Sequence, residues 1–336
     1  MIHELKKIVE AFLASKEQHK KSVLATVVAL EGSSYRRPGV RMLIHEDGKA
    51  IGAVSGGCVE KEVIRQAQSV LKDGIPKMMT YDGRYRLGCE GLLYILIEPF
   101  EPGYAFIDAF KENLRKRNPV HIVCFYSTTE GKHKSCGSIF SFDGNRFPLK
   151  EAFEIDEGLN VFKQEMKPCF KLLIIGAEHD AVQLASYASI TGWEVSIIAS
   201  PSEEKKLVDF PGAQELLCIN AEEFSTEIID DQTAVMLMTH GYVKDLKYLL
   251  KIRETNPAYI GILGPAKRRE KLLNELIERH PEVNDSFFDV AYGPAGLNIG
   301  AETAQEISIA IIAEILAVIR EEKPIMLKNK STPIHN

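Results

Sequence analysis

The spacing of apolar and polar positions changes near the middle of the chain. Up to residue 142, an amphipathic segment at helical spacing opens the sequence, and short β-rich segments punctuated by glycines follow it. Two later segments also have one apolar face at helical spacing, and Asp73-Gly74 ends the first of them. We predict helices at 4–20, 59–71 and 105–116, and strands at 22–30, 40–44, 50–54, 92–97, 120–126 and 137–142.

From Lys171 onward, short apolar strands alternate with helical segments. Such alternation is typical of right-handed βαβ units, in which helices cover a parallel sheet. The last helix is apolar on most of its faces, so we expect it to be buried. We predict strands at 171–175, 194–199, 234–238 and 259–262, and helices at 181–190 and 304–319.

The 336 residues are enough for two domains with separate cores. Residues 143–168 are polar and acidic, and we interpret them as a linker or a small excursion. The predicted fold class is α/β: an N-terminal mixed α+β domain (1–165) is followed by a C-terminal Rossmann-like domain with a parallel sheet (170–322). Residues 323–336 are predicted to form a loose tail.

Composition excludes several classes of protein. A hydrophobic fraction of 45% excludes a disordered chain, and a net charge of −6 argues against a broad surface for nucleic acid. Six dispersed cysteines without a CxxC pair or zinc spacing argue against a disulfide scaffold or structural zinc. We see no signal peptide and no apolar run near the ~20 residues that span a bilayer. We therefore expect a cytoplasmic protein that binds neither nucleic acid nor membrane.

The turn Ser55-Gly56-Gly57-Cys58-Val59-Glu60 lies between a predicted strand and a predicted helix. Two glycines allow backbone N–H groups to converge, and a helix N-terminus adds positive potential, so the turn suits an anion such as phosphate. The same environment stabilises a thiolate, which makes Cys58 a candidate reactive thiol. The alternative is a plain turn in which Cys58 is a small buried side chain.

Two other glycine-bounded segments carry candidate chemistry. In the loop from residue 32 to 42, the hydroxyls of Ser33 and Ser34 and the guanidinium of Arg36 could bind phosphate. Gly88 and Cys89 lie in a turn that leads into a strand, where a bulky ligand could approach the thiol closely. The alternatives are a solvated connection and a tight turn with a packed cysteine.

The segment 171–181 stands where a dinucleotide fingerprint would, with Gly176, His179 and Asp180 near the helix start. The second glycine of that fingerprint, which lets the backbone approach pyrophosphate, is replaced by Glu178. The next strand ends at Ser200 without a carboxylate for a ribose hydroxyl. The pattern favours a Rossmann-like fold and disfavours a working NAD or FAD site.

Three later segments also follow predicted strands: Thr239-His240, Lys267-Arg268-Arg269 at a helix start, and the glycine-rich loop 293–300. Ligands of open α/β sheets bind at strand carboxyl ends. Basic residues at a helix start oppose the helix dipole, so an anion is one reason for them. The alternatives are a solvated charge run and a histidine at the rim of the core.

Taken in order, these motifs resemble the xanthine dehydrogenase accessory protein family (XdhC, related to CoxI), over roughly residues 8–320. The N-terminal match runs through Gly32-Ser33-Ser34, Arg36, Gly39, Met42, Asp47-Gly48, Ser55-Gly56-Gly57-Cys58, Glu60, Leu87-Gly88-Cys89, Gly91 and Glu98-Pro99. The C-terminal match runs through Gly176-Ala177, His179-Asp180, Gly192-Trp193, Phe210-Pro211, Thr239-His240, Asp245, Tyr259-Ile260-Gly261, Arg268-Arg269, Gly296-Leu297, Ile299-Gly300 and Glu306-Ile307. Glu178 and Ala199-Ser200-Pro201 depart from the family pattern.

The resemblance implies a maturation factor rather than a catalyst. Such proteins bind molybdenum cofactor transiently, support its sulfuration by a cysteine desulfurase, and support its insertion into a xanthine dehydrogenase-type molybdenum hydroxylase. Cys58, and after it Cys89, would contact molybdenum or relay sulfur as a persulfide. A homodimer is the default assembly. The implied cofactor-binding residues are Ser33, Ser34, Arg36, Ser55, Gly56, Gly57, Cys58, Glu60, Gly88, Cys89, Gly176, His179 and Asp180.

Two other functions remain open from the residues. The βαβ unit at 171–199 would suit an oxidoreductase, or one component of such an enzyme, that uses NAD or FAD, although Glu178 opposes this interpretation. A structural adaptor would instead use the Rossmann-like domain to dock a dehydrogenase and a desulfurase.

Overall fold

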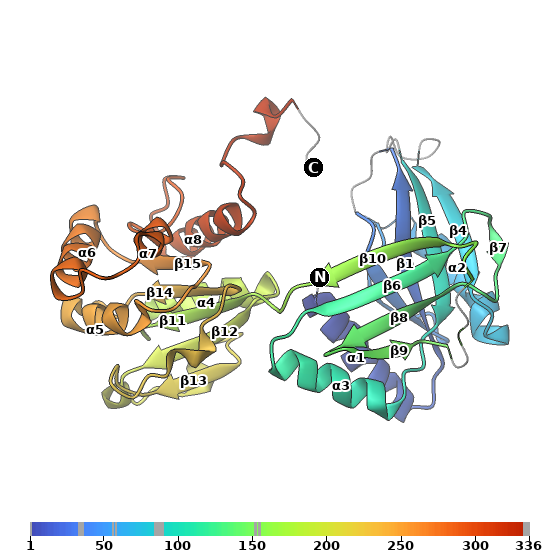
Figure 1. Cartoon of the computed structure of the whole chain (residues 1–336), viewed down its shortest axis with the longest axis horizontal. Coiled ribbons are helices and arrows are strands. Elements are labelled where there is room, and N and C mark those ends of the chain that lie inside the picture. The colour runs from blue at the N-terminus through green and yellow to red at the C-terminus, as the bar shows by residue number, and fades with distance from the viewer. Residues whose placement is uncertain are drawn as a thin grey trace. The chain divides into compact units, whose positions relative to one another are not determined.

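The computed structural model describes residues 2–32, 37–55, 57, 59–83, 91–150, 153 and 156–331. The chain divides into two compact units, Met1–Cys169 and Phe170–Asn336 (Figure 1). Each unit has its own hydrophobic clusters, and each is described separately below.

The N-terminal unit contains a six-stranded antiparallel sheet, called sheet A. Its strands are β1 (Ser22–Glu31), β2 (Arg41–His45), β3 (Ala50–Gly52), β4 (Lys77–Asp82), β5 (Leu92–Pro99) and β7 (Gly131–Lys132). They are ordered β3-β2-β1-β5-β4-β7. Alternation along β1 directs Val23, Ala25 and Val27 to one face, and Leu24 and Val28 to the other.

A second antiparallel sheet, sheet B, and three helices complete this unit. Sheet B is ordered β10-β6-β8-β9. The apolar face of α2 covers one side of sheet A, while α1, α3 and sheet B share a cluster with its other side. The elements are β6 (Val120–Tyr126), β8 (Gly137–Phe142), β9 (Asn145–Pro148), β10 (Asn160–Met166), α1 (Ile2–Glu17), α2 (Glu60–Asp73) and α3 (Tyr104–Arg115).

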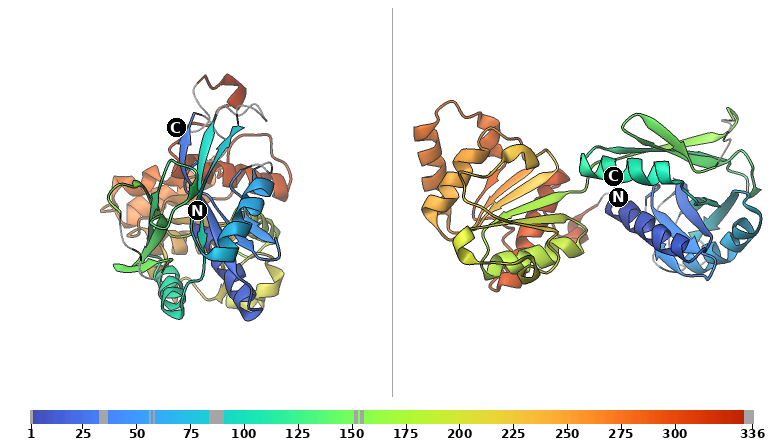
Figure 2. Two further views of the ribbon diagram at one scale, coloured as in Figure 1. Left: turned by 90° about the vertical axis from the view of Figure 1, so that its right-hand side faces the viewer. Right: turned by 90° about the horizontal axis from the view of Figure 1, so that it is seen from below.

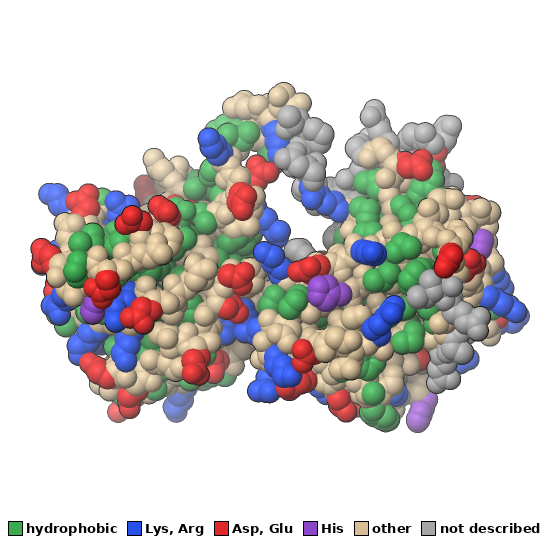
Figure 3. Space-filling view, in the orientation of Figure 1, with side chains coloured by type: hydrophobic (Ala, Val, Ile, Leu, Met, Phe, Trp, Pro, Cys, Tyr) green, Lys and Arg blue, Asp and Glu red, His purple; other side chains and the backbone are tan. Residues whose placement is uncertain are grey.

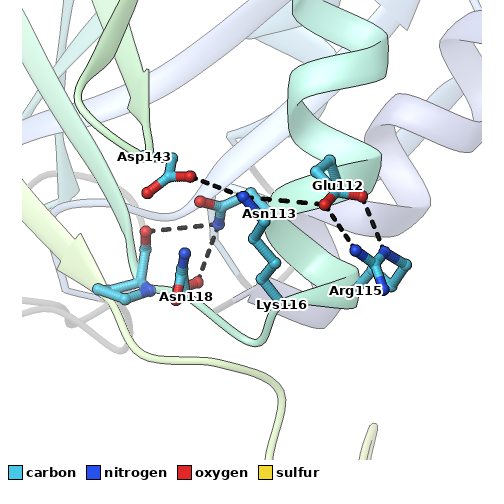
Figure 4. A network of polar contacts seen from close by, with 7 residues as sticks. Glu112, Asn113, Arg115, Lys116, Asn118 and Asp143 are labelled. Carbon is cyan, nitrogen blue, oxygen red and sulfur yellow. Dashed lines mark hydrogen bonds and ion pairs between the residues drawn. The ribbon is translucent and has the colours of Figure 1, made fainter.

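Polar contacts hold the C-terminal end of α3 against sheet B (Figure 4). The side-chain amide of Asn113 donates to the backbone carbonyl of Asn118 at 2.9 Å. This bond gives a donor to a carbonyl group in the segment that follows the helix. Lys116 pairs with Asp143 at 3.0 Å in the turn between β8 and β9. Asp143 and Gly144 both have positive φ, as the tight turn of a two-residue hairpin requires. The predicted hairpin strand 137–142 is confirmed.

Residues 143–168 are not an irregular linker, and that prediction was wrong. β9 pairs with β8 there, and all seven residues of β10 pair with β6 in sheet B. The strand β10 was not predicted because most of its side chains are exposed or partly exposed, so its sequence has no apolar face. The sequence prediction also omitted β4, whose short Met78-Met79 core gave little signal.

The C-terminal unit contains a six-stranded parallel sheet, called sheet C. Its strands are β11 (Lys171–Ile175), β12 (Glu194–Ala199), β13 (Glu215–Cys218), β14 (Thr233–Leu237), β15 (Tyr259–Ile262) and β16 (Ala291–Tyr292). They are ordered β13-β12-β11-β14-β15-β16, which is the 3-2-1-4-5-6 order of a dinucleotide-type fold. Strands are added to one side of β11 as far as β13, and the next strand, β14, is added to its other side. The topological switch point of the sheet therefore lies between β11 and β14.

Helices cover both faces of sheet C, as the right-hand view of Figure 2 shows. The cluster on one face includes α4 and α8, and the cluster on the other includes α5, α6 and α7. The last helix has a buried face, although Ile309 and Leu316 are exposed. The predicted fold class is confirmed. The helices are α4 (His179–Ile190), α5 (Tyr242–Ile252), α6 (Ala266–Arg279), α7 (Asp285–Asp289) and α8 (Ala304–Ile319).

Short 3₁₀ turns replace helices on either side of β13. They lie at Pro201–Glu203, Leu207–Asp209 and Thr226–Ile228, and a further turn, Leu327–Asn329, follows α8. Within the described ranges, no helix is both long and apolar enough to cross a membrane. Acidic and basic side chains are interspersed on the face of each unit that Figure 3 presents.

Replacing Gly176 with alanine should destabilise the C-terminal unit. Gly176 has a φ of +134°, and a Cβ built there would lie 2.4 Å from the carbonyl oxygen of Met238. Gly176→Ala should therefore cost about 2 kcal/mol or more of unfolding free energy in urea titrations. The control is Gly300→Ala, where φ is +76° but nothing lies within 4 Å. The control should cost only about 1 kcal/mol, and equal losses would contradict the steric argument.

Candidate functional site

The described part of the glycine turn before α2 is organised around Glu60. Its carboxylate accepts from the backbone N–H of Ser55 at 2.8 Å and from the Ser55 hydroxyl at 2.9 Å, while Gly57 N–H donates to the Ser55 hydroxyl at 3.3 Å. Burial raises the pKa of Glu60, but hydrogen bonds from its own backbone, Ser55 and Gly57 outweigh burial and hold it below the usual value. The described donors of this turn therefore do bind an anionic group, but that group is the carboxylate of Glu60.

The other predicted residues of the N-terminal unit fall outside the described residues. They are Ser33, Ser34, Arg36, Gly56, Cys58, Gly88 and Cys89. Their roles in holding a cofactor or relaying sulfur stay predictions. Among the described cysteines, Cys124, Cys136 and Cys169 are buried and Cys218 is exposed. The described ranges hold no group of three or more His, Cys, Asp or Glu side chains placed to ligate a metal ion.

In the C-terminal unit, the predicted residues meet at the switch point of sheet C. Gly176 begins the turn after β11, and His179 and Asp180 begin α4. His240, which the sequence also singled out, follows β14 with a φ of +55°, and the structure places its Nε2 3.9 Å from Asp180 Oδ2. Glu178 is the exposed N-cap residue of α4 and makes no side-chain capping hydrogen bond.

A buried carboxylate fixes the loop after β14. Asp245 is fully buried and accepts from the Thr239 hydroxyl at 2.6 Å, from the Thr239 backbone N–H at 3.2 Å, and from Arg268 at 2.6 Å. These charge-assisted contacts join the loop to α5 and α6 and so hold His240 opposite Asp180. The sequence left open whether Arg268 attracts an anion or is solvated, and the structure instead pairs its guanidinium with Asp245.

A cavity of about 150 Å³ lies at the carboxyl ends of β11 to β14. Gly176 lines this cavity, and His179 and Asp180 do not. The sequence predicted the strand-end location because parallel strands expose their carboxyl ends together. The twelve lining residues are Gly176, Ile198, Ser200, Glu203, Ile219, Asn220, Ala221, Glu222, Thr239, Lys244, Lys247 and Tyr248.

A buried polar cluster, which the sequence prediction missed, connects the two sheets of the N-terminal unit. Glu98 on β5 is 1% exposed and accepts from the hydroxyl and backbone N–H of Ser138 on β8, at 2.5 and 2.9 Å. Arg41 on β2 donates to Gln164 on β10 at 2.7 Å. The Cys124 sulfur lies 3.1 Å from the Ser138 hydroxyl. Burial raises the pKa of Glu98 to about 7, although Ser138 and the charge of Arg41 act against it.

A signal for this cluster is present in the sequence. Strict alternation along β5 places Glu98 on the same face as Leu96, and alternation along β2 places Arg41 with Leu43. A charged residue on the apolar face of a strand needs a buried partner. The partners lie on sheet B, so the periodicity identifies the need but not the residues that meet it.

Two family profiles match the chain. The XdhC and CoxI family matches residues 15–82, and the XdhC Rossmann domain matches residues 172–315. A protein of Bacillus subtilis named as a probable xanthine dehydrogenase subunit is 30% identical over 89% of this chain and 94% of its own length. The "Molybdenum cofactor insertion chaperone PaoD" of Escherichia coli is 25% identical over 92% of this chain and 86% of its own length.

A solved structure shares the fold along nearly the whole chain. It is described as a xanthine dehydrogenase from Bacillus halodurans, and it superposes with a TM-score of 0.77 at 28% identity. The match covers 97% of this chain and 98% of that one.

The charge state of Glu98 should make stability depend on pH. Its pKa is about 7 in the folded protein and 4.5 in the unfolded chain, so the folded state binds the proton more tightly. The stabilisation is complete below pH 4.5 and is lost as pH rises through 7, a change of about 3 kcal/mol. Glu98→Gln should remove this slope in chemical denaturation between about pH 4 and about pH 8.

The exposed Glu165 of β10 provides the matched control, because Glu165→Gln removes the same charge from the surface. Its stability curve should run parallel to that of the wild type. A Glu98→Gln curve that is also parallel to the wild type would contradict the assigned pKa of Glu98.

Proposed function

The chain belongs to the XdhC and CoxI family, and on that premise we propose that it binds molybdenum cofactor and supports its insertion into a xanthine dehydrogenase-type molybdenum hydroxylase. The observation that carries the proposal is the likeness, over 92% of this chain, to a protein named as a molybdenum cofactor insertion chaperone. In this role the cofactor is cargo, and the chain is a maturation factor rather than a catalyst.

The finer part of the proposal is sulfuration of the bound cofactor. A cysteine desulfurase would supply sulfane sulfur, and Cys58 or Cys89 would contact molybdenum or carry that sulfur as a persulfide. Thiolates are suitable because molybdenum accepts soft sulfur ligands. The glycines beside both cysteines support this assignment, since they leave room for a bulky ligand.

The anionic pterin phosphate of the cargo needs donors that the protein does not already use. Glu60 already occupies the described donors of the Ser55 turn. We therefore assign the phosphate mainly to Ser33, Ser34 and Arg36, which offer two hydroxyls and a guanidinium. Glu60 would then fix the described part of the Ser55 turn through its hydrogen bonds to Ser55.

The strand order of sheet C favours a second candidate, an oxidoreductase that uses NAD or FAD. Two carboxylates oppose it. Glu178 and Asp180 stand at the start of α4, where a dinucleotide places its pyrophosphate, and like charges repel there. The maturation role is therefore the better supported of the two.

Replacing Cys58 should reduce cofactor retention. Full-length protein purified from a host that makes molybdenum cofactor should contain molybdenum and pterin, and Cys58→Ala should contain about tenfold less, equivalent to about 1.4 kcal/mol of binding free energy. Molybdenum would be measured by elemental analysis and pterin by fluorescence after oxidation. The control, Cys218→Ala, removes an exposed thiol of the C-terminal unit and should retain wild-type levels.

Equal retention by the two variants would exclude Cys58 as the thiol that contacts the cargo. Absence of molybdenum and pterin from the wild-type protein would contradict the proposed function as a whole.

A further inference from the structure

The cavity at the end of sheet C is lined by residues that the proposed function does not use. It lies at the carboxyl ends of the neighbouring parallel strands β11, β12 and β13. Gly176, in the turn after β11, is one of its lining residues. In parallel sheets of this strand order, the nucleoside half of a ligand lies beside the first and second strands. The cavity therefore lies where this fold binds the nucleoside part of its ligands, and its side chains decide which ligand fits.

Glu203 supplies the carboxylate that the sequence did not show at the end of β12. The 3₁₀ turn Pro201–Glu203 folds back from the strand end and brings this side chain to the cavity. Oε1 accepts from Lys244 at 3.4 Å, whereas Oε2 is buried and has no hydrogen-bonding partner among the described residues. A buried carboxylate oxygen without a donor is costly, so this position favours a ligand that brings hydroxyl groups.

The rest of the lining is mixed, because polar side chains such as Ser200, Asn220 and Thr239 lie beside apolar ones. Ile198, Ile219, Ala221 and Tyr248 contribute the apolar lining, and the Tyr248 hydroxyl donates to the carbonyl of Ile219 at 3.2 Å. This bond ties α5 to the segment after β13 and keeps the walls apart. An apolar part of the lining beside a diol acceptor suits the planar base and the ribose of a nucleoside.

The size and charge of the surroundings limit what the nucleoside can carry. A volume of about 150 Å³ is below the ~300–1,000 Å³ of pockets that enclose drug-sized ligands, so the cavity is too small to enclose a dinucleotide and limits the ligand to a single nucleoside at most. The N-terminus of α4, where a diphosphate would continue, begins with Glu178 and Asp180. Their carboxylates repel a diphosphate and tolerate a neutral or cationic group.

We propose that this cavity binds a ribonucleoside that has no diphosphate on its 5′ carbon, with Oε2 of Glu203 accepting the ribose hydroxyls. Lys244 orients the carboxylate through Oε1 and leaves Oε2 for the ligand. The site is independent of the thiol-bearing loops of the N-terminal unit, so it adds a second ligand to the cofactor cargo. Loss of one binding activity would leave the other intact.

Calorimetric titration of the full-length protein with adenosine, guanosine and uridine would test the site. At least one should bind, and its 2′-deoxy analogue should bind about tenfold more weakly, because a hydrogen bond to the charged acceptor is lost. Glu203→Gln should weaken binding by at least about tenfold. Glu222→Gln is the matched control: it removes the same charge from the same cavity, but its carboxylate pairs with Lys247 and it should change the dissociation constant less than about twofold.

Three outcomes would overturn the proposal. No heat with any of the three nucleosides at millimolar concentration would exclude the site. Equal affinities for the ribo and deoxyribo forms, or for wild type and Glu203→Gln, would exclude the carboxylate as the ribose acceptor. Tighter binding of ADP, NAD or FAD than of adenosine would show that Glu178 and Asp180 do not exclude a diphosphate.

Discussion

The position of β11 between two parallel neighbours is the constraint on which the C-terminal unit depends. Its core residues from Leu172 to Ile175 are fully buried, since helices cover both faces of the sheet. The chain can leave this strand only by a turn that passes close to the backbone after β14, where Gly176 meets Met238. That close passage brings the start of α4, the loop with His240 and the floor of the cavity to one edge of the sheet.

The N-terminal unit depends on a different constraint: its two antiparallel sheets bury polar groups between them, and these groups need hydrogen-bonding partners. Glu98 and Arg41 each lie on sheet A and find hydrogen-bonding partners on sheet B. Burial raises the pKa of Glu98, so the contact depends on the protonation state of a group inside the core. The thiols predicted to handle cargo, Cys58 and Cys89, belong to glycine-bounded segments of the sequence and are not part of this buried cluster as described.

Part of the candidate site in the C-terminal unit could be predicted from sequence. The glycine after a predicted strand identified the Gly176 turn, since strand, glycine and helix start are contiguous in the chain, whereas the glycine-bounded segments of the N-terminal unit stay predictions. Glu203 was not predicted because its carboxylate reaches the end of β12 only through a 3₁₀ turn. The pairings of Asp180 with His240 and of Asp245 with Arg268 span elements that are distant in sequence, so no local pattern contains them.

The sequence by itself determined the two-part architecture, most helices and strands, and the family, because each depends on local periodicity or on the order of short motifs. It did not place β10 in sheet B, since an exposed strand has no apolar alternation and is recognised only by its pairing with β6. It also did not reveal which polar groups would be buried together. Tertiary structure decided that, because the cost of burying Glu98, Asp245 or Oε2 of Glu203 depends on neighbours that only the folded chain supplies.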